Sequence, residues 1–267
     1  MTARGHAKPP RVLVVAGSDS GGGAGVQADV KTITMLGGFA ATAITALTAQ
    51  NTLGVQGVMP VPAAFVAAQM RSVLDDIGAD AVKIGMIGSA GTAHAVADEL
   101  ERLDVPIVFD PVMVATSGSV LADRDTIGAF ERLMRRASVV TPNLPELEAL
   151  GGEAAVLRLA PAVLVKGGHA EGPTVTDRLV TRDGGGAAWP NRRIDTRHTH
   201  GTGCTLASAI ATRLGEGWGL VDAVDAAIAF VRAAMVHAPG LGAGAGPLGH
   251  GLVPHRLPPE SPGPTVG

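Results

Sequence analysis

The stretch His198-Thr-His-Gly-Thr-Gly-Cys-Thr205 runs directly into Leu206-Ala-Ser-Ala-Ile-Ala-Thr-Arg-Leu214, which is rich in alanine and apolar at helical spacing. A glycine-rich turn that leads into a helix leaves backbone N–H groups unpaired at the positive end of the helix dipole. Such a turn favours an anion, commonly a phosphate. Cys204 falls in the first helical turn, where we expect the dipole to lower the pKa of its thiol. An anion-binding turn beside a potential base suggests phosphoryl transfer to a small alcohol.

Outward from this stretch, short apolar runs alternate with amphipathic segments, which predicts an α/β fold with a mostly parallel sheet covered by helices on both faces. We expect strands over residues 11–16, 40–47, 81–84, 106–109, 138–141 and 162–166, and two or three antiparallel strands within 174–197. We expect helices over residues 26–36, 62–77, 89–103, 123–136, 145–150, 202–214 and 219–237.

The same pattern predicts the domain organisation. No linker interrupts residues 11–241, so we expect a single domain there, preceded by a disordered leader over 1–10. The tail over 242–267 is rich in glycine and then in proline, a composition typical of chain without packed structure.

Composition excludes several classes of protein. The net charge is −3, so electrostatics gives no case for binding nucleic acid or an anionic membrane. Tyrosine is absent and only 3% of residues are aromatic, which argues against a base-stacking surface. The single cysteine excludes an intrachain disulfide and a cysteine-cluster metal site and fits a reducing cytoplasm. No apolar run is long enough to be a signal peptide or to span a bilayer.

Polar residues follow the predicted strands, at the edge of a parallel sheet where ligands bind. They are Asp19, Gln50, Lys83, Asp110, Asn143 and Lys166.

The glycine loop over residues 21–25 lacks the ending of a P-loop and the acidic residue that a dinucleotide site needs, so it is equally well a tight turn. Asp29 follows in the first turn of the next helix, where the dipole favours a carboxylate in any case. The functional interpretation is that the Asp29 carboxylate accepts a hydrogen bond from an amino group or hydroxyl of the substrate. Gln50 can donate and accept hydrogen bonds, which suits the edge of a heteroaromatic ring, or it merely caps a strand end.

Asp110 and Glu146 place carboxylates at the ends of two strands, and two such ligands suit Mg²⁺, which takes its other ligands from water and phosphates. The alternative for Asn143 and Glu146 is a helix capping box. Lys166 precedes two glycines that let a phosphate approach, although it is equally a solvated residue at a strand end.

Two further features have ordinary alternatives. Cys204 is otherwise a small, inert residue buried at a helix start, but its neighbours favour the active role. His198 and His200 have no third ligand at a useful spacing, so we predict no metal there.

Seven motifs, in order between residues 11 and 240, together resemble the hydroxymethylpyrimidine/phosphomethylpyrimidine kinases of thiamine biosynthesis. They are Ala16-Gly-Ser-Asp-Ser-Gly-Gly-Gly-Ala-Gly-Val-Gln-Ala-Asp29, Thr45-Ala-Leu-Thr-Ala-Gln-Asn-Thr52, Lys83-Ile-Gly-Met86, Asp110-Pro-Val-Met113, Thr141-Pro-Asn-Leu-Pro-Glu146, Val165-Lys-Gly-Gly-His169 and Thr199-His-Gly-Thr-Gly-Cys-Thr205.

The resemblance implies a ribokinase-like three-layer αβα sandwich that uses ATP and Mg²⁺. It implies phosphorylation of 4-amino-5-hydroxymethyl-2-methylpyrimidine to its monophosphate, and then of the monophosphate to the diphosphate. It also implies a cytoplasmic homo-oligomer, a dimer.

The resemblance assigns roles motif by motif. Cys204 stands where the wider superfamily has an aspartate base, and the amides from Gly201 through Thr202 and Gly203 to Cys204 hold the transferring phosphate. The remaining roles are Gln50 for the pyrimidine edge, Asp29, Ala24, Met86 and Val112 for the rest of that pocket, Asp110 and Glu146 for Mg²⁺, and Lys166 for the nucleotide phosphates.

The segment over residues 147–161 is shorter than usual for this family, which bears more on the nucleotide side than on the pyrimidine pocket. Two other functions fit the same motifs. One is a pyridoxal or pyridoxine kinase, whose substrate is also a heteroaromatic ring with a hydroxymethyl group. The other is a pyrimidine-binding module without catalytic activity.

Overall fold

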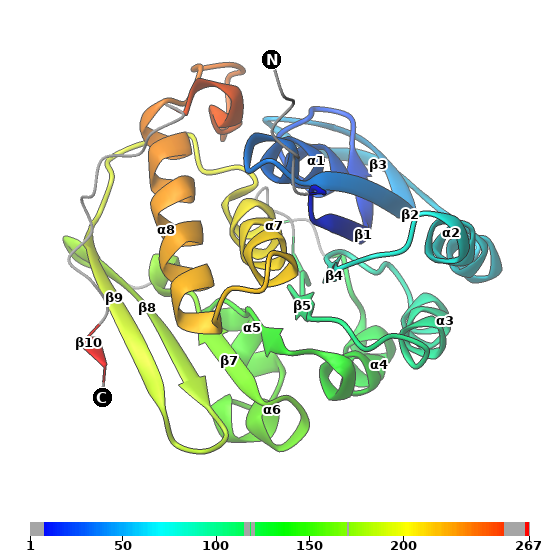
Figure 1. The fold of residues 1–267 in the computed structure, drawn as a ribbon. Coiled ribbons are helices and arrows are strands. Elements are labelled where there is room, and N and C mark those ends of the chain that lie inside the picture. Colours follow the sequence, from blue (N-terminus) through cyan, green and yellow to red (C-terminus); the bar gives the residue numbers. More distant parts are fainter. Residues whose placement is uncertain (1–7, 115–117, 119–120, 170, 254–264, 267) are drawn as a thin grey trace, which may run out of the picture.

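In a computed structural model of the chain, the described residues are 8–114, 118, 121–169, 171–253 and 265–266. They form an α/β sandwich around one sheet (Figure 1). The strands are β1 (Arg11–Asp19), β2 (Phe39–Asn51), β3 (Gly54–Pro60), β4 (Ala81–Ile84), β5 (Ile107–Phe109), β6 (Val139–Val140), β7 (Ala162–Val165), β8 (Thr174–Thr181), β9 (Gly186–Arg192) and β10 (Thr265–Val266). The helices are α1 (Gly25–Met35), α2 (Ala63–Asp76), α3 (Ala90–Leu100), α4 (Arg124–Arg136), α5 (Leu144–Ala149), α6 (Glu153–Leu159), α7 (Thr202–Gly215) and α8 (Leu220–Val236).

The sheet within the described residues has the strand order β10-β9-β8-β7-β6-β5-β4-β1-β2-β3. The six strands from β7 to β2 in this order pair in parallel, and the strands outside them pair antiparallel. This confirms the predicted mostly parallel sheet. Because the strands in the parallel core run the same way, their carboxyl ends meet at one edge, where ligands bind in such folds.

The sheet has an apolar core on each face, which explains why the sequences of the central strands are unbroken apolar runs. In β1, Leu13 and Val15 belong to the core beneath α2, α3, α4 and α6. Val12 and Val14 belong to the opposite core beneath α1, α7 and α8. Successive side chains of a strand point to opposite faces, so a strand covered on both sides must be apolar at every position. Figure 1 shows these two helical layers on either side of the sheet.

Two elements of the structure were not predicted from the sequence. The sequence prediction missed the edge strand β3, which pairs antiparallel with β2, and the short helix α6. Phe65 of α2 is 61% exposed, because the helix turns Val66 and Met70 to the core instead.

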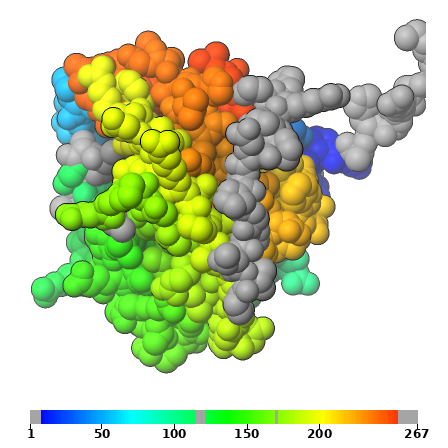
Figure 2. All heavy atoms as spheres, turned by 90° about the vertical axis from the view of Figure 1, so that its left-hand side faces the viewer, coloured from blue at the N-terminus to red at the C-terminus, as the bar shows by residue number. Residues whose placement is uncertain are grey.

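The predicted unpacked tail over 242–267 is wrong for its first part. Leu248, His250 and Val253 are buried, and Leu248 and Val253 share an apolar cluster with Phe230 of α8. Figure 2 shows the chain up to Val253, in orange and red, forming one continuous surface with the yellow segment near residue 200. Residues 1–7 of the predicted leader, and 254–264 and 267 of the tail, lie outside the described residues.

Within the described part of the chain, no helix is both long and apolar enough to cross a membrane.

Candidate active site

Two glycine loops contact each other at the carboxyl edge of the sheet. The first, after β1, turns into α1 through Gly25, whose φ is +56°. The second precedes α7 through Gly201, whose φ is +90°. A Cβ atom on Gly201 would overlap the carbonyl oxygen of Gly23, and one on Gly25 would overlap that of Gly17. Glycine is therefore required at both turns, by backbone angle and by close approach.

The start of α7 is built as the sequence predicted. No side chain caps this end of the helix. Gly201, Thr202, Gly203 and Cys204 all line the same cavity. Backbone amides at the positive end of a helix of this length favour an anion.

The predicted lowering of the Cys204 pKa is wrong. The pKa of the Cys204 thiol is raised to about 11, because burial and the nearby carboxylates of Asp29 and Asp110 outweigh the lowering effects of Lys83 and of a backbone hydrogen bond with Gly25. Removal from water and the two carboxylates disfavour the thiolate more than Lys83 and the Gly25 backbone favour it. Cys204 is therefore a thiol at neutral pH.

Asp110, Glu146 and Lys166 meet on one side of the cavity. Lys166 Nζ lies 2.7 Å from Asp110 Oδ1 and 3.6 Å from Glu146 Oε2. Burial and the Asp110 carboxylate raise the pKa of Glu146, while Lys166 opposes this rise. A Cβ atom on Gly203 would lie 3.2 Å from Lys166 Nζ and 3.4 Å from Asp110 Oδ2, so this cluster directly faces the anion-binding turn.

The alternative reading of Asn143 and Glu146 is confirmed at the same time. The Asn143 side chain accepts from the Glu146 amide at 2.9 Å, and Glu146 Oε2 accepts from the Asn143 amide at 2.8 Å. These reciprocal bonds form a capping box at the start of α5. The box fixes the Glu146 carboxyl group at the cavity rather than removing it from the site.

Asp29 is the predicted site residue that the structure places elsewhere. Its side chain is fully buried beneath α1 and is absent from the cavity wall. Asp29 Oδ1 lies 2.9 Å from Lys83 Nζ and accepts from Ser208 Oγ at 2.7 Å. Burial lowers the pKa of Lys83, but the surrounding acidic groups, Asp29 foremost, outweigh this and raise it. Asp29 therefore holds a buried ion pair between α1, β4 and α7 and does not line the cavity.

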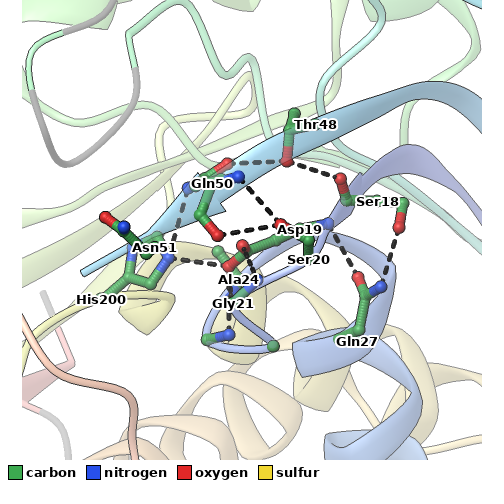
Figure 3. A network of polar contacts seen from close by, with 12 residues as sticks. Ser18, Asp19, Ser20, Gly21, Ala24, Gln27, Thr48, Gln50, Asn51 and His200 are labelled. Atoms are coloured by element: carbon green, nitrogen blue, oxygen red, sulfur yellow. Dashed lines mark hydrogen bonds and ion pairs between the residues drawn. The ribbon is translucent and has the colours of Figure 1, made fainter. Parts of the chain in front are cut away.

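Gln50, the last residue but one of β2, belongs to a polar network that the sequence analysis did not predict (Figure 3). The register of β2 against β3 shifts between Ala49 and Gln50, an irregularity that redirects side chains at sheet edges. Beside Gln50 lies His200, which is 7% exposed and pairs with Asp19 at 2.8 Å. Residues 19 and 200 are far apart in sequence, so no local pattern could reveal this pair.

One cavity of about 1190 Å³ joins these groups. That exceeds the volume of a typical single-ligand pocket, so it can hold two ligands side by side. All the predicted site residues except Asp29 line it, namely Ala24, Gln50, Met86, Asp110, Val112, Glu146, Lys166, Gly201, Thr202, Gly203 and Cys204.

Comparison with known proteins gives one consistent result. The family model described as phosphomethylpyrimidine kinase matches residues 19–249. A hydroxymethylpyrimidine/phosphomethylpyrimidine kinase of Rhizobium meliloti is 48% identical over 89% of this chain and 96% of its own length. A multifunctional thiamine biosynthesis protein of Corynebacterium efficiens is 45% identical over 93% of this chain, which spans only 36% of that longer protein.

Two groups of solved structures share the fold. A pyridoxal kinase from Staphylococcus aureus in complex with ADP has a TM-score of 0.85 at 29% identity, covering 98% of this chain and 99% of its own. A phosphomethylpyrimidine kinase from Clostridium difficile has a TM-score of 0.72 at 33% identity, covering 84% of this chain and 98% of its own. The fold is thus common to both kinases. The family model and the relatives found by sequence, in contrast, both indicate the pyrimidine kinases. The chain belongs to the phosphomethylpyrimidine kinase family.

Proposed function

We propose that this protein transfers the γ-phosphoryl group of ATP to 4-amino-5-hydroxymethyl-2-methylpyrimidine and then phosphorylates the monophosphate to the diphosphate, in thiamine biosynthesis. The observation that carries the proposal is the single cavity that contains Gln50, the anion-binding turn before α7 and the cluster around Lys166. A ring-recognising amide and a phosphate-binding cluster within one cavity are what transfer between a nucleotide and a small alcohol requires.

The proposed binding residues form two groups, one for the pyrimidine ring and one for the phosphoryl group. Gln50 hydrogen-bonds the pyrimidine edge, and Ala24, Met86 and Val112 form the apolar walls around the ring. The amides from Gly201 to Cys204 bind the phosphoryl group in transit. Preorganised donors stabilise the charge that develops there without having to reorient.

Cys204 accepts the proton of the hydroxymethyl group as its oxygen attacks the γ-phosphorus atom and the bond to the leaving ADP breaks. This step requires the thiolate form of Cys204, which its raised pKa makes scarce at neutral pH. The rate of the chemical step should therefore rise with pH across the neutral range.

Mg²⁺ fits the acidic cluster as a phosphate-bound ion. Within the described residues, no group of three or more His, Cys, Asp or Glu side chains could hold a metal ion. Mg²⁺ in kinases needs only one or two carboxylates besides phosphates and water. Asp110 and Glu146 would supply these, and Lys166 would bind the nucleotide phosphates. The ion would neutralise phosphate charge during transfer.

We further propose a cytoplasmic homodimer. Large apolar side chains are exposed on β2, β3, α2 and the turn between the two strands, which supports association through this side of the sheet. They are Phe39, Leu47, Leu53, Val58, Met59 and Phe65. Light scattering of the purified protein measures the oligomeric state, and a monomer at micromolar concentration would contradict the dimer.

The test of the activity is a coupled assay of ADP release with the pyrimidine alcohol, its monophosphate and pyridoxal as separate substrates. We expect ADP release with both pyrimidines and a lower kcat/KM with pyridoxal. A higher kcat/KM with pyridoxal would identify a pyridoxal kinase instead. ATP consumption that none of the three compounds stimulates would refute the proposed function.

A further inference from the structure

Asp19 fixes the hydrogen-bonding state of His200. Asp19 Oδ1 accepts from the amide of Gly21, and Oδ2 accepts from the amides of Gly23 and Ala24. Burial opposes the charge on Asp19, but the bonds from His200 and these amides outweigh it and lower its pKa. Asp19 is therefore an acceptor only. Because His200 Nε2 lies 2.8 Å from Asp19 Oδ2, Nε2 must carry the hydrogen.

The hydroxyl of Thr48 determines which end of the Gln50 amide faces it. Thr48 Oγ1 lies 2.9 Å from the carbonyl oxygen of Ser18 and 3.1 Å from one terminal atom of the Gln50 amide. A hydroxyl has one hydrogen, and a carbonyl oxygen can only accept, so the hydrogen goes to Ser18. The Gln50 atom that faces Thr48 must then be a donor, which is the NH₂ group.

His200 leads to the same orientation independently. The other terminal atom of the Gln50 amide lies 3.4 Å from His200 Nε2, which already carries a hydrogen. Two donors would repel there, so that atom must be the oxygen. Amide oxygen and nitrogen are nearly identical in shape and are distinguished by such partners. The Gln50 amide is therefore turned by 180° from the orientation drawn in Figure 3.

This orientation leaves a defined pair of groups for a ligand. Gln50 lines the cavity, and each end of its amide has one position that the network does not use. The oxygen, on the His200 side, keeps a second lone pair. The nitrogen, on the Thr48 side, keeps a second hydrogen. A ligand edge thus meets an acceptor towards His200 and a donor towards Thr48.

An aminopyrimidine matches this pair in only one orientation. Its exocyclic amino group donates to the Gln50 oxygen, and the adjacent ring nitrogen accepts from the Gln50 nitrogen. The hydroxymethyl group is next to the amino group, on the side away from that ring nitrogen. It therefore lies towards His200, which directly precedes the anion-binding turn that ends at Cys204. The reversed amide would direct the hydroxymethyl group towards Thr48.

We propose that Asp19, His200 and Thr48 are positioning residues that hold the Gln50 amide in one orientation, and that this orientation decides which way round the pyrimidine binds. The proposal rests on the proposed function. It also predicts discrimination against pyridoxal, because the group next to the hydroxymethyl of pyridoxal is an aldehyde. Its oxygen would face the oxygen of Gln50, and no hydrogen bond would form.

The test compares the pyrimidine alcohol with its analogue that lacks the amino group. In the wild-type protein, removing the amino group should lower kcat/KM. Thr48→Val removes the acceptor for the Gln50 nitrogen, whereas Thr48→Ser keeps it. We expect the penalty for the missing amino group to shrink about fivefold in Thr48→Val, the effect of one neutral hydrogen bond, and to stay at the wild-type value in Thr48→Ser.

A second pair of variants tests the contact between His200 and the Gln50 amide. His200→Gln retains an N–H donor of similar reach, and His200→Leu removes it, so the penalty should shrink in the leucine variant alone. Thermal melting identifies a variant that fails to fold, and the Thr48 pair then decides. A penalty that is equal in wild type, Thr48→Val and Thr48→Ser would overturn the positioning role and leave the proposed function intact. A wild-type protein that phosphorylates neither pyrimidine would refute the proposed function itself.

Discussion

Replacing Asp29 by asparagine separates a structural role from a role in substrate binding. The substitution leaves the ammonium of Lys83 without its counter-charge, and both side chains are fully buried. Removing one partner of such a pair costs about 3–5 kcal/mol of the free energy of unfolding. In a chain of this size that corresponds to a fall in Tm of roughly 10 °C. Because Asp29 is absent from the cavity wall, the KM for the pyrimidine alcohol should change less than about twofold in the folded variant.

Two further variants control this experiment. Asp75→Asn makes the same change at the exposed ion pair between Asp75 and Arg102 and should leave the Tm close to that of the wild type. The double substitution Asp29→Leu with Lys83→Met removes both buried charges and should recover most of the lost stability. Differential scanning calorimetry and steady-state kinetics measure the two effects. An Asp29→Asn protein that melts like wild type but has a tenfold higher KM would refute this reasoning.

Three other predictions follow from the site and its surroundings. Iodoacetamide should alkylate Cys204, the only cysteine, about tenfold faster for each pH unit between pH 7 and 10, because its pKa is raised to about 11; a rate that levels off below pH 8 would contradict this. Burial and Lys31 lower the pKa of His250 to about 4, so the neutral form stabilises the fold above pH 6.5 and this stability is lost as the pH falls through 4. Urea unfolding should show the wild type losing about 3 kcal/mol more than His250→Gln between pH 7 and 4, and equal losses would exclude this residue as the cause. Glu146→Gln keeps the capping box, so its Tm should stay near wild type while half-maximal activity requires about tenfold more Mg²⁺; an unchanged Mg²⁺ requirement would remove Glu146 from the ion.

Local patterns in the sequence predicted most of the fold. The apolar run in β1 and the helical spacing after Cys204 each reflect contacts with a neighbouring layer, and such contacts repeat with the period of the element. The edge strand β3 escaped prediction because it is mostly exposed and carries little apolar pattern. The packed segment up to Val253 escaped because its glycine-rich composition resembles that of an unpacked chain.

The positions of the cavity residues were also predictable, because parallel strands bring their carboxyl ends to one edge. That rule placed Gln50, Asp110 and Lys166 together without reference to the structure. It could not tell whether a polar side chain near the start of a helix faces the cavity or the core, and Asp29 lies on the second turn of α1 rather than on the predicted first turn. Asp29 faces the core because β4 offers Lys83 beneath it.

The sequence by itself determined the order of strands and helices, the glycine turns and the edge of the sheet where ligands bind, since all of these depend on neighbours along the chain. Only the tertiary structure decided the charge state of Cys204, the burial of Asp29 and the pairing of His200 with Asp19. Each of these depends on how much water and which charges surround a group. Both are set by segments that fold against it from distant parts of the chain.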